Sequence, residues 1–402
     1  MEHIEMSDKK MHICLVVNEF PGLTETFITT KALELSKKGH KVTVIKNQDN
    51  RLVNTSHIVA VKQAGIKIIS APEAGSLSSL FILLFKYPSI ALQSSTFSIK
   101  EFAHNFQKNL KSHLLKKYSF DIVHVEFSGL GVAYQKALEQ TTAKTIVSCR
   151  GTAEKVKPLS EPHRKEQLKK LFESVSSIHC VSQDMANTIA PFCNDLSKIF
   201  INRPSIDTSI FKRVNPYPKQ KATIAILSIG RFTFQKGYLI GLMAMHILHK
   251  NGIAFTWTIV GDGPLKEEMI YHINALCIQD KVKLIGKKNR DEILELYNST
   301  DIFLLTSFYE GIANVCLEAM SMELPVVATK SGGMEEVIEH GKDGFLCNTY
   351  DPESIAEAVK GIFNDADQRK LMGVHARQKV MNEFTIQKQA DIFEKKYQQL
   401  IS

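Results

Sequence analysis

Apolar and polar positions follow one another along this chain in an order that predicts buried strands separated by helices. Residues 11–18 (MHICLVVN) and 223–230 (TIAILSIG) are continuous apolar runs, which is typical of parallel strands covered on both faces. Helices are expected after these runs, over residues 25–38 and 238–250. A repeated order of strand and helix predicts parallel sheets joined by right-handed crossovers.

The same pattern continues through both halves of the chain. Further strands are expected over residues 41–46, 61–69, 121–126, 145–148, 177–181, 255–260, 282–284, 302–305 and 325–329. Between the halves, residues 203–204 and 215–221 are rich in proline and charge, which is typical of inter-domain linkers. We therefore predict an α/β chain with two domains, residues 1–205 and 222–384, and ligands bound at the carboxyl ends of the strands.

The composition restricts the class of protein. Of the 402 residues, 44% are hydrophobic, which excludes disorder as the main state. The seven cysteines are scattered without a C-x-x-C pair, so we expect reduced thiols rather than disulfides or a zinc site. No uncharged run reaches the ~20 residues of a spanning helix, and residues 1–10 lack the apolar core of a signal peptide. We therefore expect a cytoplasmic protein.

Charge is distributed unevenly between the two halves. Residues 1–215 contain 29 Lys and Arg against 19 Asp and Glu, whereas the remaining residues contain 21 against 23. Such a basic surplus favours an anionic partner, such as nucleic acid, phosphate groups or a membrane surface. No nucleic-acid-binding module is recognisable in the sequence, so nucleic acid is not expected as a partner. A basic surface that meets only solvent is the alternative.

One basic segment has the pattern of an amphipathic helix. In residues 101–118 the apolar side chains Phe102, Phe106, Leu110 and Leu114 recur on one stripe, and the lysines lie largely off it. Such a helix can contact anionic lipid, which would place the protein peripherally on the inner face of the cell membrane. Alternatively, the stripe packs on the core of its own domain.

Two glutamates eight positions apart, Glu310 and Glu318, are candidates for chemistry. Glu310 precedes Gly311 in an expected loop, and a helix is expected to begin near residues 313–314. The free amides at the start of that helix can bind a diphosphate, and Gly311 lets the backbone approach closely. Glu318, about one turn into the helix, can accept hydrogen bonds from the vicinal hydroxyls of a ribose. The spacing alone also fits surface charges on a helix.

Four segments resemble glycosyltransferase family 4. Residues 307–338 contain the context E-G-x-x-N-x-x-x-E-A-M, which is similar to the E-x7-E signature of that family. Residues 228–237 (SIGRFTFQKG) resemble its G-R-x-x-x-x-K-G element, and residues 260–264 (VGDGP) its V-G-x-G-P turn. Residues 20–28 (FPGLTETFI) resemble the opening loop of members that assemble polysaccharides. The four segments stand in the order of the family and cover most of the chain.

The resemblance implies the GT-B fold, in which two facing Rossmann-like domains enclose an interdomain cleft. It implies that a C-terminal helix, residues 385–402, packs back on the first domain. It also implies a hexosyltransferase that transfers a sugar with retention of configuration from a nucleotide diphosphate sugar, UDP- or GDP-linked, without a metal or another cofactor. The acceptor would be a polysaccharide, a lipid-linked sugar or another glycan.

The resemblance also implies roles for individual residues. Glu310 would contact hydroxyls of the donor sugar and Glu318 the ribose, while Arg231 and Lys236 would neutralise the diphosphate. Gly22, in the opening loop, would border the phosphates from the other domain. Main-chain amides would share the phosphate or sugar, those of Gly311, Ile312, Ala313, Asn314 and Val315.

The chain departs from the family pattern at two positions. Where many members carry H-x-H, this sequence has His124-Val125-Glu126, and where many carry His-Gly it has Arg150-Gly151. We hypothesise that Glu126 is catalytic, because its carboxylate can accept a sugar hydroxyl or stabilise oxocarbenium-like charge. Arg150, and Glu25 in the opening loop, are candidate contacts of an acidic acceptor or a phosphate. Alternatively, Glu126 and Arg150 pair with each other between neighbouring strands.

Other motifs are weaker. Asp365-Ala366-Asp367 is a D-x-D in a late hydrophilic helix, where a metal site is not expected, and Gly261-x-Gly263 lacks the third glycine of a dinucleotide fingerprint. The sequence therefore predicts a glycosyltransferase. The alternatives are a non-catalytic subunit that binds a sugar nucleotide, and a GT-B enzyme of other chemistry such as a sugar-nucleotide epimerase or a phosphorylase.

Overall fold

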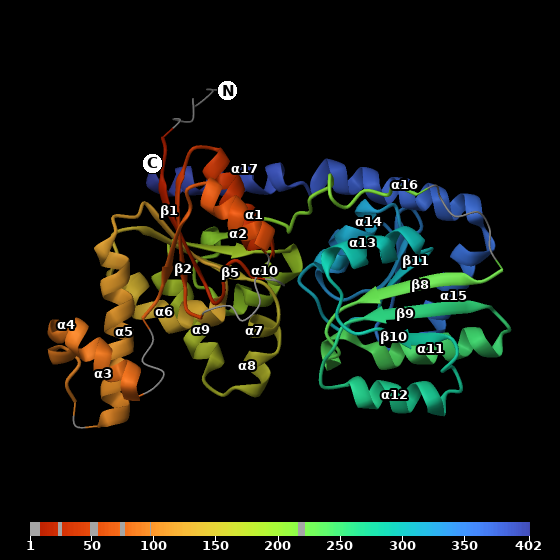
Figure 1. The fold of residues 1–402 in the computed structure, drawn as a ribbon, viewed down its shortest axis with the longest axis horizontal. Helices are drawn as coiled ribbons and strands as arrows, with labels where there is room; N and C mark the ends of the chain where they lie inside the picture. Colours follow the sequence, from red (N-terminus) through yellow and green to blue (C-terminus); the bar gives the residue numbers. More distant parts are fainter. Residues whose placement is uncertain (1–8, 23–25, 49–54, 73–76, 97, 216–221) are drawn as a thin grey trace. The chain divides into compact units, whose positions relative to one another are not determined.

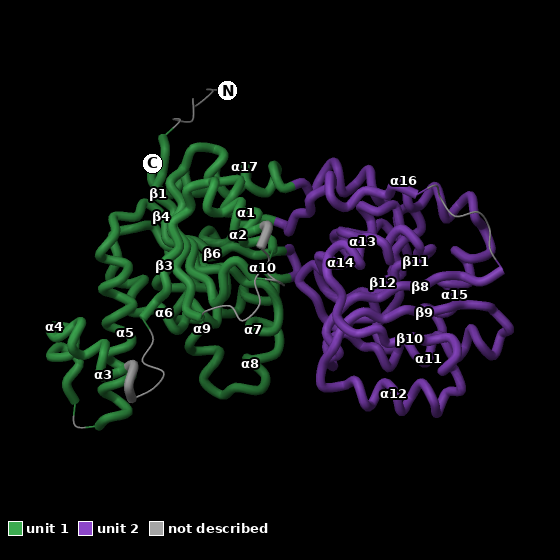
Figure 2. The backbone as a smooth tube through the Cα atoms, viewed as in Figure 1, with its two compact units in different colours: residues 1–181, 185–202, 386–402 green, residues 182–184, 203–385 purple. Residues whose placement is uncertain are grey.

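The computed structural model describes residues 9–22, 26–48, 55–72, 77–96, 98–215 and 222–402. The chain divides into two compact units (Figure 2). Unit 1 comprises residues 1–181, 185–202 and 386–402, and unit 2 comprises residues 182–184 and 203–385. Of the linker predicted at residues 215–221, all but Asn215 lies outside the described residues.

Unit 1 contains a parallel sheet with the strand order β3-β2-β1-β4-β5-β6-β7 (Figure 1). Its strands are β1 (His12–Val17), β2 (Lys41–Lys46), β3 (Lys67–Ser70), β4 (Ile122–Val125), β5 (Lys144–Cys149), β6 (Ser177–Cys180) and β7 (Ile199–Ile201). Strands β1 and β4 are buried almost throughout, because helices cover both faces of the sheet. The order 3-2-1-4-5-6 is that of a Rossmann-like domain.

The helices of unit 1 include one from the far end of the sequence. They are α1 (Thr26–Lys37), α2 (Thr55–Gln63), α3 (Leu77–Lys86), α4 (Pro88–Leu92), α5 (Ile99–Lys117), α6 (Ser128–Gln140), α7 (Thr152–Lys155), α8 (Lys157–Ser160), α9 (Arg164–Ser174), α10 (Gln183–Ile189) and α17 (Ile386–Ile401). Helix α10 begins in the short stretch assigned to unit 2. Helix α17 inserts Phe393 and Tyr397 into the core beside Ile13 and Leu15 of β1, so the C-terminus completes this unit.

Unit 2 repeats the architecture with the strand order β10-β9-β8-β11-β12-β13. Its strands are β8 (Ile224–Ile229), β9 (Phe255–Val260), β10 (Val282–Leu284), β11 (Ile302–Leu305), β12 (Val326–Thr329) and β13 (Gly344–Cys347). Its helices are α11 (Tyr238–Lys250), α12 (Lys266–Ala275), α13 (Arg290–Ser299), α14 (Asn314–Ser321), α15 (Pro352–Asn364) and α16 (Ala366–Glu383). Trp257 of β9 lies fully buried in its core.

One predicted strand is wrong, two strands were missed, and one alternative that the sequence left open is decided. The strand predicted at residues 61–69 is mostly helix and turn, because α2 continues to Gln63 and Gly65, at φ 67°, ends it before β3. The short strands β7 and β13 were not predicted. The stripe of α5 does not face outward: Phe106, Leu110 and Leu114 are buried, so the alternative of packing on the domain holds.

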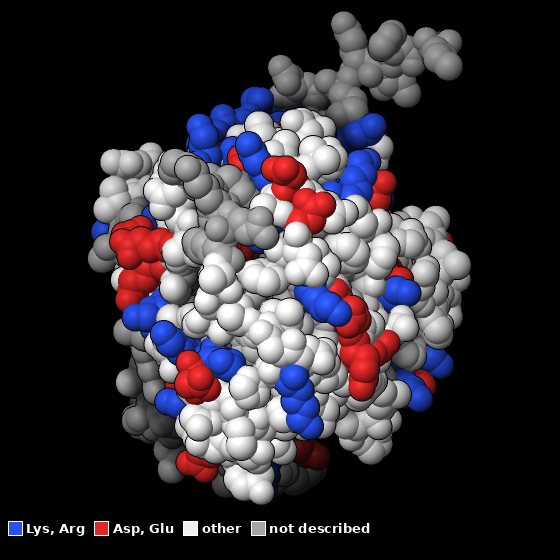
Figure 3. All heavy atoms as spheres, turned by 90° about the vertical axis from the view of Figure 1, so that its right-hand side faces the viewer, with Lys and Arg blue, Asp and Glu red and all other residues white. Residues whose placement is uncertain are grey.

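Surface charge and helix length both bear on contact with a membrane. Figure 3 shows one face of the molecule, on which the coloured acidic and basic side chains lie interspersed around a broad uncharged area. No helix within the described residues combines the length and the apolar character needed to cross a membrane.

Candidate active site

The carboxyl ends of β8 and β11 bring Lys236 and Glu310 together in unit 2. Lys236 ends the short helix η3 (Phe234–Lys236), and its Nζ lies 2.6 Å from Glu310 Oε1. Ser307 Oγ donates a hydrogen bond to the same oxygen at 2.7 Å, and Gln235 Nε2 donates to Oε2 at 3.2 Å. Three donors therefore fix the Glu310 carboxylate, whose side chain is 8% exposed against 16% for Lys236. A carboxylate held in this way can accept hydrogen bonds from sugar hydroxyls.

Glycines let the loops around this pair approach one another closely. Gly237, at φ 58°, follows Lys236, and a Cβ there would lie 2.1 Å from the carbonyl oxygen of Thr306. A Cβ on Gly333 would lie 1.6 Å from the carbonyl oxygen of Gly311. The Glu310 amide donates to Ser331 O at 3.0 Å, which ties the Glu310 loop to the turn at residues 331–333 that contains Gly333. Both turns therefore require glycine.

Helix α14 begins beside Glu310. Gly311, Ile312 and Ala313 are buried, while Asn314 and Val315, the first residues of the helix, are half-buried. Within the described chain, no side chain caps this helix, because Ala313 occupies the N-cap position. Its first amides therefore keep the partial positive charge that binds anions.

Glu318 lies in the second turn of α14. The Tyr297 hydroxyl donates to Glu318 Oε2 at 3.0 Å and lies 3.1 Å from Val315 O. Burial raises the pKa of the Glu318 carboxyl to about 7, and the hydrogen bond from Tyr297 acts in the opposite direction. Tyr297, on α13, was not predicted from the sequence, because only the fold brings it to Glu318.

Arg231 stands apart from this group. It lies exposed in the loop after β8, whereas Lys236 at the end of the same loop reaches Glu310. The neighbouring V-G-D-G-P turn packs on that loop, since a Cβ on Gly261 would lie 1.9 Å from Gly230 O. The structure thus places Arg231 at the carboxyl end of β8 as predicted by the motif, but with its side chain in solvent. Its role stays a prediction.

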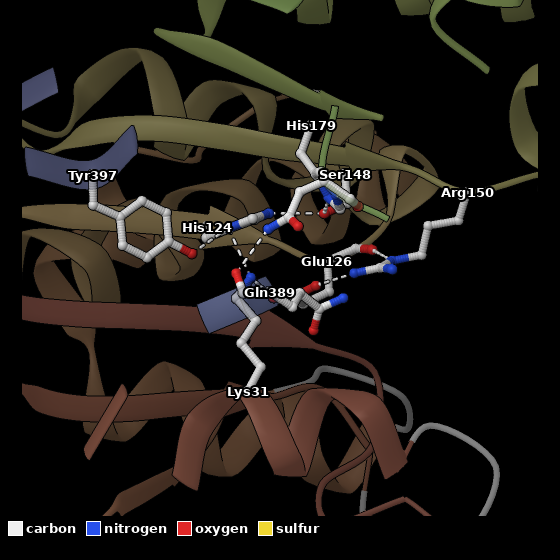
Figure 4. Close-up of polar contacts among 9 residues, drawn as sticks. Lys31, His124, Glu126, Ser148, Arg150, His179, Gln389 and Tyr397 are labelled. Atoms are coloured by element: carbon white, nitrogen blue, oxygen red, sulfur yellow. Dashed lines mark hydrogen bonds and ion pairs between the residues drawn. The ribbon is translucent and has the colours of Figure 1, made fainter. Parts of the chain in front are cut away.

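In unit 1, Glu126 lies at the end of β4 between two cations (Figure 4). Its Oε1 lies 2.6 Å from Lys31 Nζ, and its Oε2 lies 2.5 Å from Arg150 Nη2. Glu126 is 0% and Lys31 2% exposed, while Arg150 is 16% exposed. Burial opposes ionisation, but the two cations together hold the pKa of Glu126 below its usual range. The pairing of Glu126 with Arg150 is present, and Lys31 joins it, a residue that the sequence did not single out.

A chain of hydrogen bonds leads away from Lys31 through two buried histidines (Figure 4). Nδ1 of His124 lies 2.9 Å from Lys31 Nζ, and its Nε2 lies 2.8 Å from Ser148 Oγ. Ser148 Oγ lies 2.8 Å from Nδ1 of His179, whose Nε2 lies 2.8 Å from the carbonyl oxygen of Asn202.

The groups at the two ends of this series of hydrogen bonds, Lys31 and the carbonyl of Asn202, fix the direction of every hydrogen bond in it. A Lys31 ammonium only donates, so Nδ1 of His124 accepts and its Nε2 carries the proton. The carbonyl of Asn202 only accepts, so Nε2 of His179 donates to it and Ser148 donates to His179. Burial lowers the pKa of both histidines, so both rings are neutral.

Further contacts close this cluster. Lys31 Nζ lies 3.8 Å from the ring centroid of Phe393, and the Tyr397 hydroxyl lies 2.7 Å from His124 Nδ1. Burial lowers the pKa of Lys31 to about 8, and Glu126 opposes that shift. Arg150 lies 4.4 Å from the ring of Phe27, at the start of α1. Helix α17 therefore helps to seal the cluster.

Of the two residues of the opening loop that were predicted to contact ligands, the structure describes only one. Gly22 is buried directly before the gap in the described chain, whereas Glu25 lies outside the described residues. Asp365 of the D-x-D accepts a hydrogen bond from the Gln368 amide at 2.8 Å, as the N-cap of α16. Within the residues described, no group of three His, Cys, Asp or Glu is placed to hold a metal ion.

Comparison with known proteins bears on the identity of these sites. The family model Glycosyltransferase Family 4 matches residues 24–210, and the model Glycosyl transferases group 1 matches residues 210–379. The chain is a member of glycosyltransferase family 4. The predicted family is therefore confirmed, and the two matches meet near the passage from unit 1 to unit 2.

Two curated relatives of this glycosyltransferase are named for polysaccharide biosynthesis. The amylovoran biosynthesis glycosyltransferase AmsK of Erwinia amylovora is 26% identical over 392 residues, which cover 93% of this chain and 96% of AmsK. The putative colanic acid biosynthesis glycosyltransferase WcaL of Escherichia coli is 32% identical over 200 residues, 47% of this chain and 48% of WcaL.

Solved structures of glycosyltransferases share the fold. A Rickettsia africae glycosyltransferase aligns with a TM-score of 0.72 at 20% identity, covering 98% of this chain and all of that one. Anabaena Alr3699/HepE, solved with UDP and glucose, aligns with a TM-score of 0.72 at 18% identity, covering 96% of this chain and 99% of that one. The predicted α/β fold of the GT-B class is therefore confirmed.

Proposed function

We propose that this glycosyltransferase transfers a hexose from a nucleotide diphosphate sugar to a glycan acceptor, with retention of configuration and without a metal. The observation that carries the proposal is the Lys236–Glu310 pair beside the uncapped start of α14. A cation and free amides favour a diphosphate, and a fixed carboxylate favours sugar hydroxyls. The three features lie together at the carboxyl ends of parallel strands, where α/β sheets bind ligands.

We assign each part of the nucleotide-sugar donor to particular protein groups. Lys236 and the amides of residues 311–315 bind the diphosphate, and their positive charge stabilises the leaving phosphate as the sugar bond breaks. Glu310 accepts hydrogen bonds from the sugar, and Glu318 accepts them from the ribose. UDP is the first nucleotide to test, since HepE was solved with UDP and glucose; GDP is the second.

The acceptor is a polysaccharide or a lipid-linked sugar. The support is the name of AmsK, a relative from amylovoran biosynthesis that covers almost the whole chain. We propose a cytoplasmic place at the inner membrane surface, where a lipid-linked acceptor is accessible.

Nucleotide binding is the first test. In a thermal-shift measurement, saturation with UDP or GDP at about 100 times the dissociation constant should add roughly 2.7 kcal/mol of stability. Lys236→Ala should abolish the shift, and Lys266→Ala, on the exposed side of α12, should preserve it. The absence of a shift with every nucleoside diphosphate would contradict the proposed donor class.

Retention of configuration is tested on the product, and metal independence is tested on the reaction rate. NMR of the transferred sugar should show the anomeric configuration of the donor, and a chelator should leave the rate unchanged. An inverted product, or a rate that falls with chelator and returns with Mg²⁺, would overturn the corresponding part of the proposal.

A non-catalytic sugar-nucleotide subunit is the second candidate. The observation that favours it is Glu126, which fills the place of a family imidazole and is occupied by Lys31 and Arg150. This candidate predicts nucleotide binding without transfer to any acceptor and without slow hydrolysis of the donor.

A further inference from the structure

Large apolar side chains are exposed in one short part of unit 1. Phe81, Ile82, Phe85, Leu92 and Ile99 are between 63% and 79% exposed. They belong to α3, α4 and the first residue of α5, and we refer to these five side chains as the α3–α4 surface. The rings of Phe81 and Phe85, one helical turn apart, lie 4.8 Å from each other. Apolar exposure of this density marks an interaction site.

The other sides of these helices are already packed. Leu83, Ile90, Phe106 and Leu110 form a small separate core, with Leu80 and Leu84 packed against it. In Figure 1, α3 and α4 lie beside one end of the long helix α5, away from the strands of the sheet. Helix α3 therefore carries apolar side chains both toward its own core and toward solvent. An apolar distribution around most of a helix is typical of one with an apolar environment on both sides.

The charge around the α3–α4 surface indicates what covers it. Residues 77–117 contain six lysines and one glutamate, and neither Asp nor Arg. Lys86 and Lys100 are exposed directly beside Phe85 and Ile99 in the sequence. Apolar side chains with neighbouring lysines suit the boundary of an anionic bilayer, where the apolar groups enter the acyl region and the ammonium groups meet phosphates. A second copy of this chain would instead place the same lysines against one another.

We propose that the α3–α4 surface docks on the surface of an anionic phospholipid bilayer. Phe81, Ile82 and Phe85 enter the acyl region at its boundary with the headgroups, and Lys86 and Lys100 lie at lipid phosphates. The inference deepens the proposed function, on which it rests for the lipid-linked acceptor. It assigns the contact to α3, α4 and the start of α5, whereas Phe106, Leu110 and Leu114 of the α5 stripe are buried.

Vesicle co-sedimentation of the full chain tests the inference without donor or acceptor. Vesicles of phosphatidylcholine with phosphatidylglycerol should bind the protein. The affinity for pure phosphatidylcholine vesicles should be lower by about tenfold or more. The double variants F81S/F85S and K86E/K100E should each lower the affinity about tenfold or more. The matched controls are Leu159→Ser, an 82% exposed leucine on α8, and K165E/K170E on α9. These controls should bind as the wild type does.

A fluorescence reporter separates insertion from mere adhesion. The chain has one tryptophan, Trp257, and it is fully buried in unit 2. A Phe85→Trp variant therefore adds an exposed indole whose emission should shift to the blue when anionic vesicles are added. Unchanged emission, or equal binding by F81S/F85S and the wild type, would overturn the inference.

Two further outcomes are decisive. Concentration-dependent dimerisation that F81S/F85S abolishes, in a protein that does not bind vesicles, would assign the α3–α4 surface to a second copy and overturn the inference. The UDP or GDP thermal shift should be the same in F81S/F85S as in the wild type. A normal shift without vesicle binding would refute the bilayer and leave the proposed donor chemistry intact.

Discussion

Two lysine–glutamate pairs, one in each unit, have the same separation and very different surroundings. Lys31 and Glu126 in unit 1 lie 2.6 Å apart, as do Lys236 and Glu310 in unit 2. The unit 1 pair is sealed beneath α17 and shares its carboxylate with Arg150. The unit 2 pair lies at the carboxyl ends of two strands and is less deeply buried, with the Glu310 side chain 8% and the Lys236 side chain 16% exposed.

The two pairs differ in how many N–H groups of the lysine remain to bind a ligand. Lys31 donates to Glu126 and His124 and lies over Phe393, so its ammonium is occupied inside the protein. Among the described residues, Lys236 donates only to Glu310, which leaves two of its three N–H groups for a ligand. We therefore interpret the first pair as one that positions α1, β4 and β5, and the second as one that binds substrate.

Removal of the buried carboxylate should give the largest effect. Glu126→Ala leaves Lys31 and Arg150 without their shared counter-charge, so the free energy of unfolding should fall by about 3–5 kcal/mol in urea titration. Glu161→Ala, which removes an exposed pair with Lys157, should cost no more than about 1 kcal/mol.

A second substitution at Glu126 distinguishes a positioning role of this residue from a catalytic one. Glu126→Gln keeps the shape of the side chain and removes its charge. If turnover disappears while the unfolding free energy stays at the wild-type value, Glu126 is catalytic, as hypothesised from the sequence, and the comparison of the two pairs fails. Full turnover would remove the catalytic hypothesis.

Removal of the open carboxylate should act on turnover instead. Glu310→Gln loses the ion pair with Lys236 and a strong acceptor for sugar hydroxyls, so kcat should fall roughly 100-fold. The unfolding free energy should fall less than in Glu126→Ala, because the amide oxygen of the variant can still accept hydrogen bonds from Lys236 and Ser307. Glu292→Gln, which removes an exposed pair with Lys288, is the control and should keep full turnover. Comparable rates for the two variants would contradict the substrate-binding interpretation of Lys236 and Glu310.

The sequence predicts the regular part of the fold well. Residues 238–250, 255–260 and 302–305 were predicted with the bounds that the structure shows, because continuous apolar runs and glycine-terminated helices mark these elements. The strand predicted at 61–69 was wrong, since the apolar residues of α2 and β3 run together in the sequence. The stripe of α5 was ambiguous by nature, because an amphipathic pattern does not say which surface covers it.

The site is less accessible to sequence reasoning. The motifs select Glu310 and Lys236, which the structure brings into contact. They do not select Lys31, Tyr297 or Tyr397, whose contacts join residues 95, 21 and 273 positions apart. A single lysine in an amphipathic helix resembles a surface residue until the fold places Glu126 beside it. Only the complete packing therefore shows which charges are occupied.

A pH dependence should distinguish Glu318 from the charged pairs. Its pKa rises from 4.5 to about 7 on folding, so the folded state favours the protonated form. Its contribution to the unfolding free energy is therefore fully present below pH 4.5 and is lost as the pH rises through about 7. The difference in unfolding free energy between Glu318→Gln and wild type should change in this direction over that window. A constant difference would show that Glu318 is not desolvated.

The smallest effect should come from Tyr297, which supports Glu318 without carrying charge. Tyr297→Phe removes one hydrogen bond to the carboxyl group, worth about 1 kcal/mol, so nucleotide affinity at neutral pH should fall about fivefold. Because that hydrogen bond lowers the pKa of Glu318, its loss should move the pH dependence of nucleotide binding upward. The affinity loss should therefore shrink at alkaline pH, where Glu318 is ionised in both proteins. Calorimetry across this range checks the prediction: a loss that is independent of pH would mean that Tyr297 acts through packing alone.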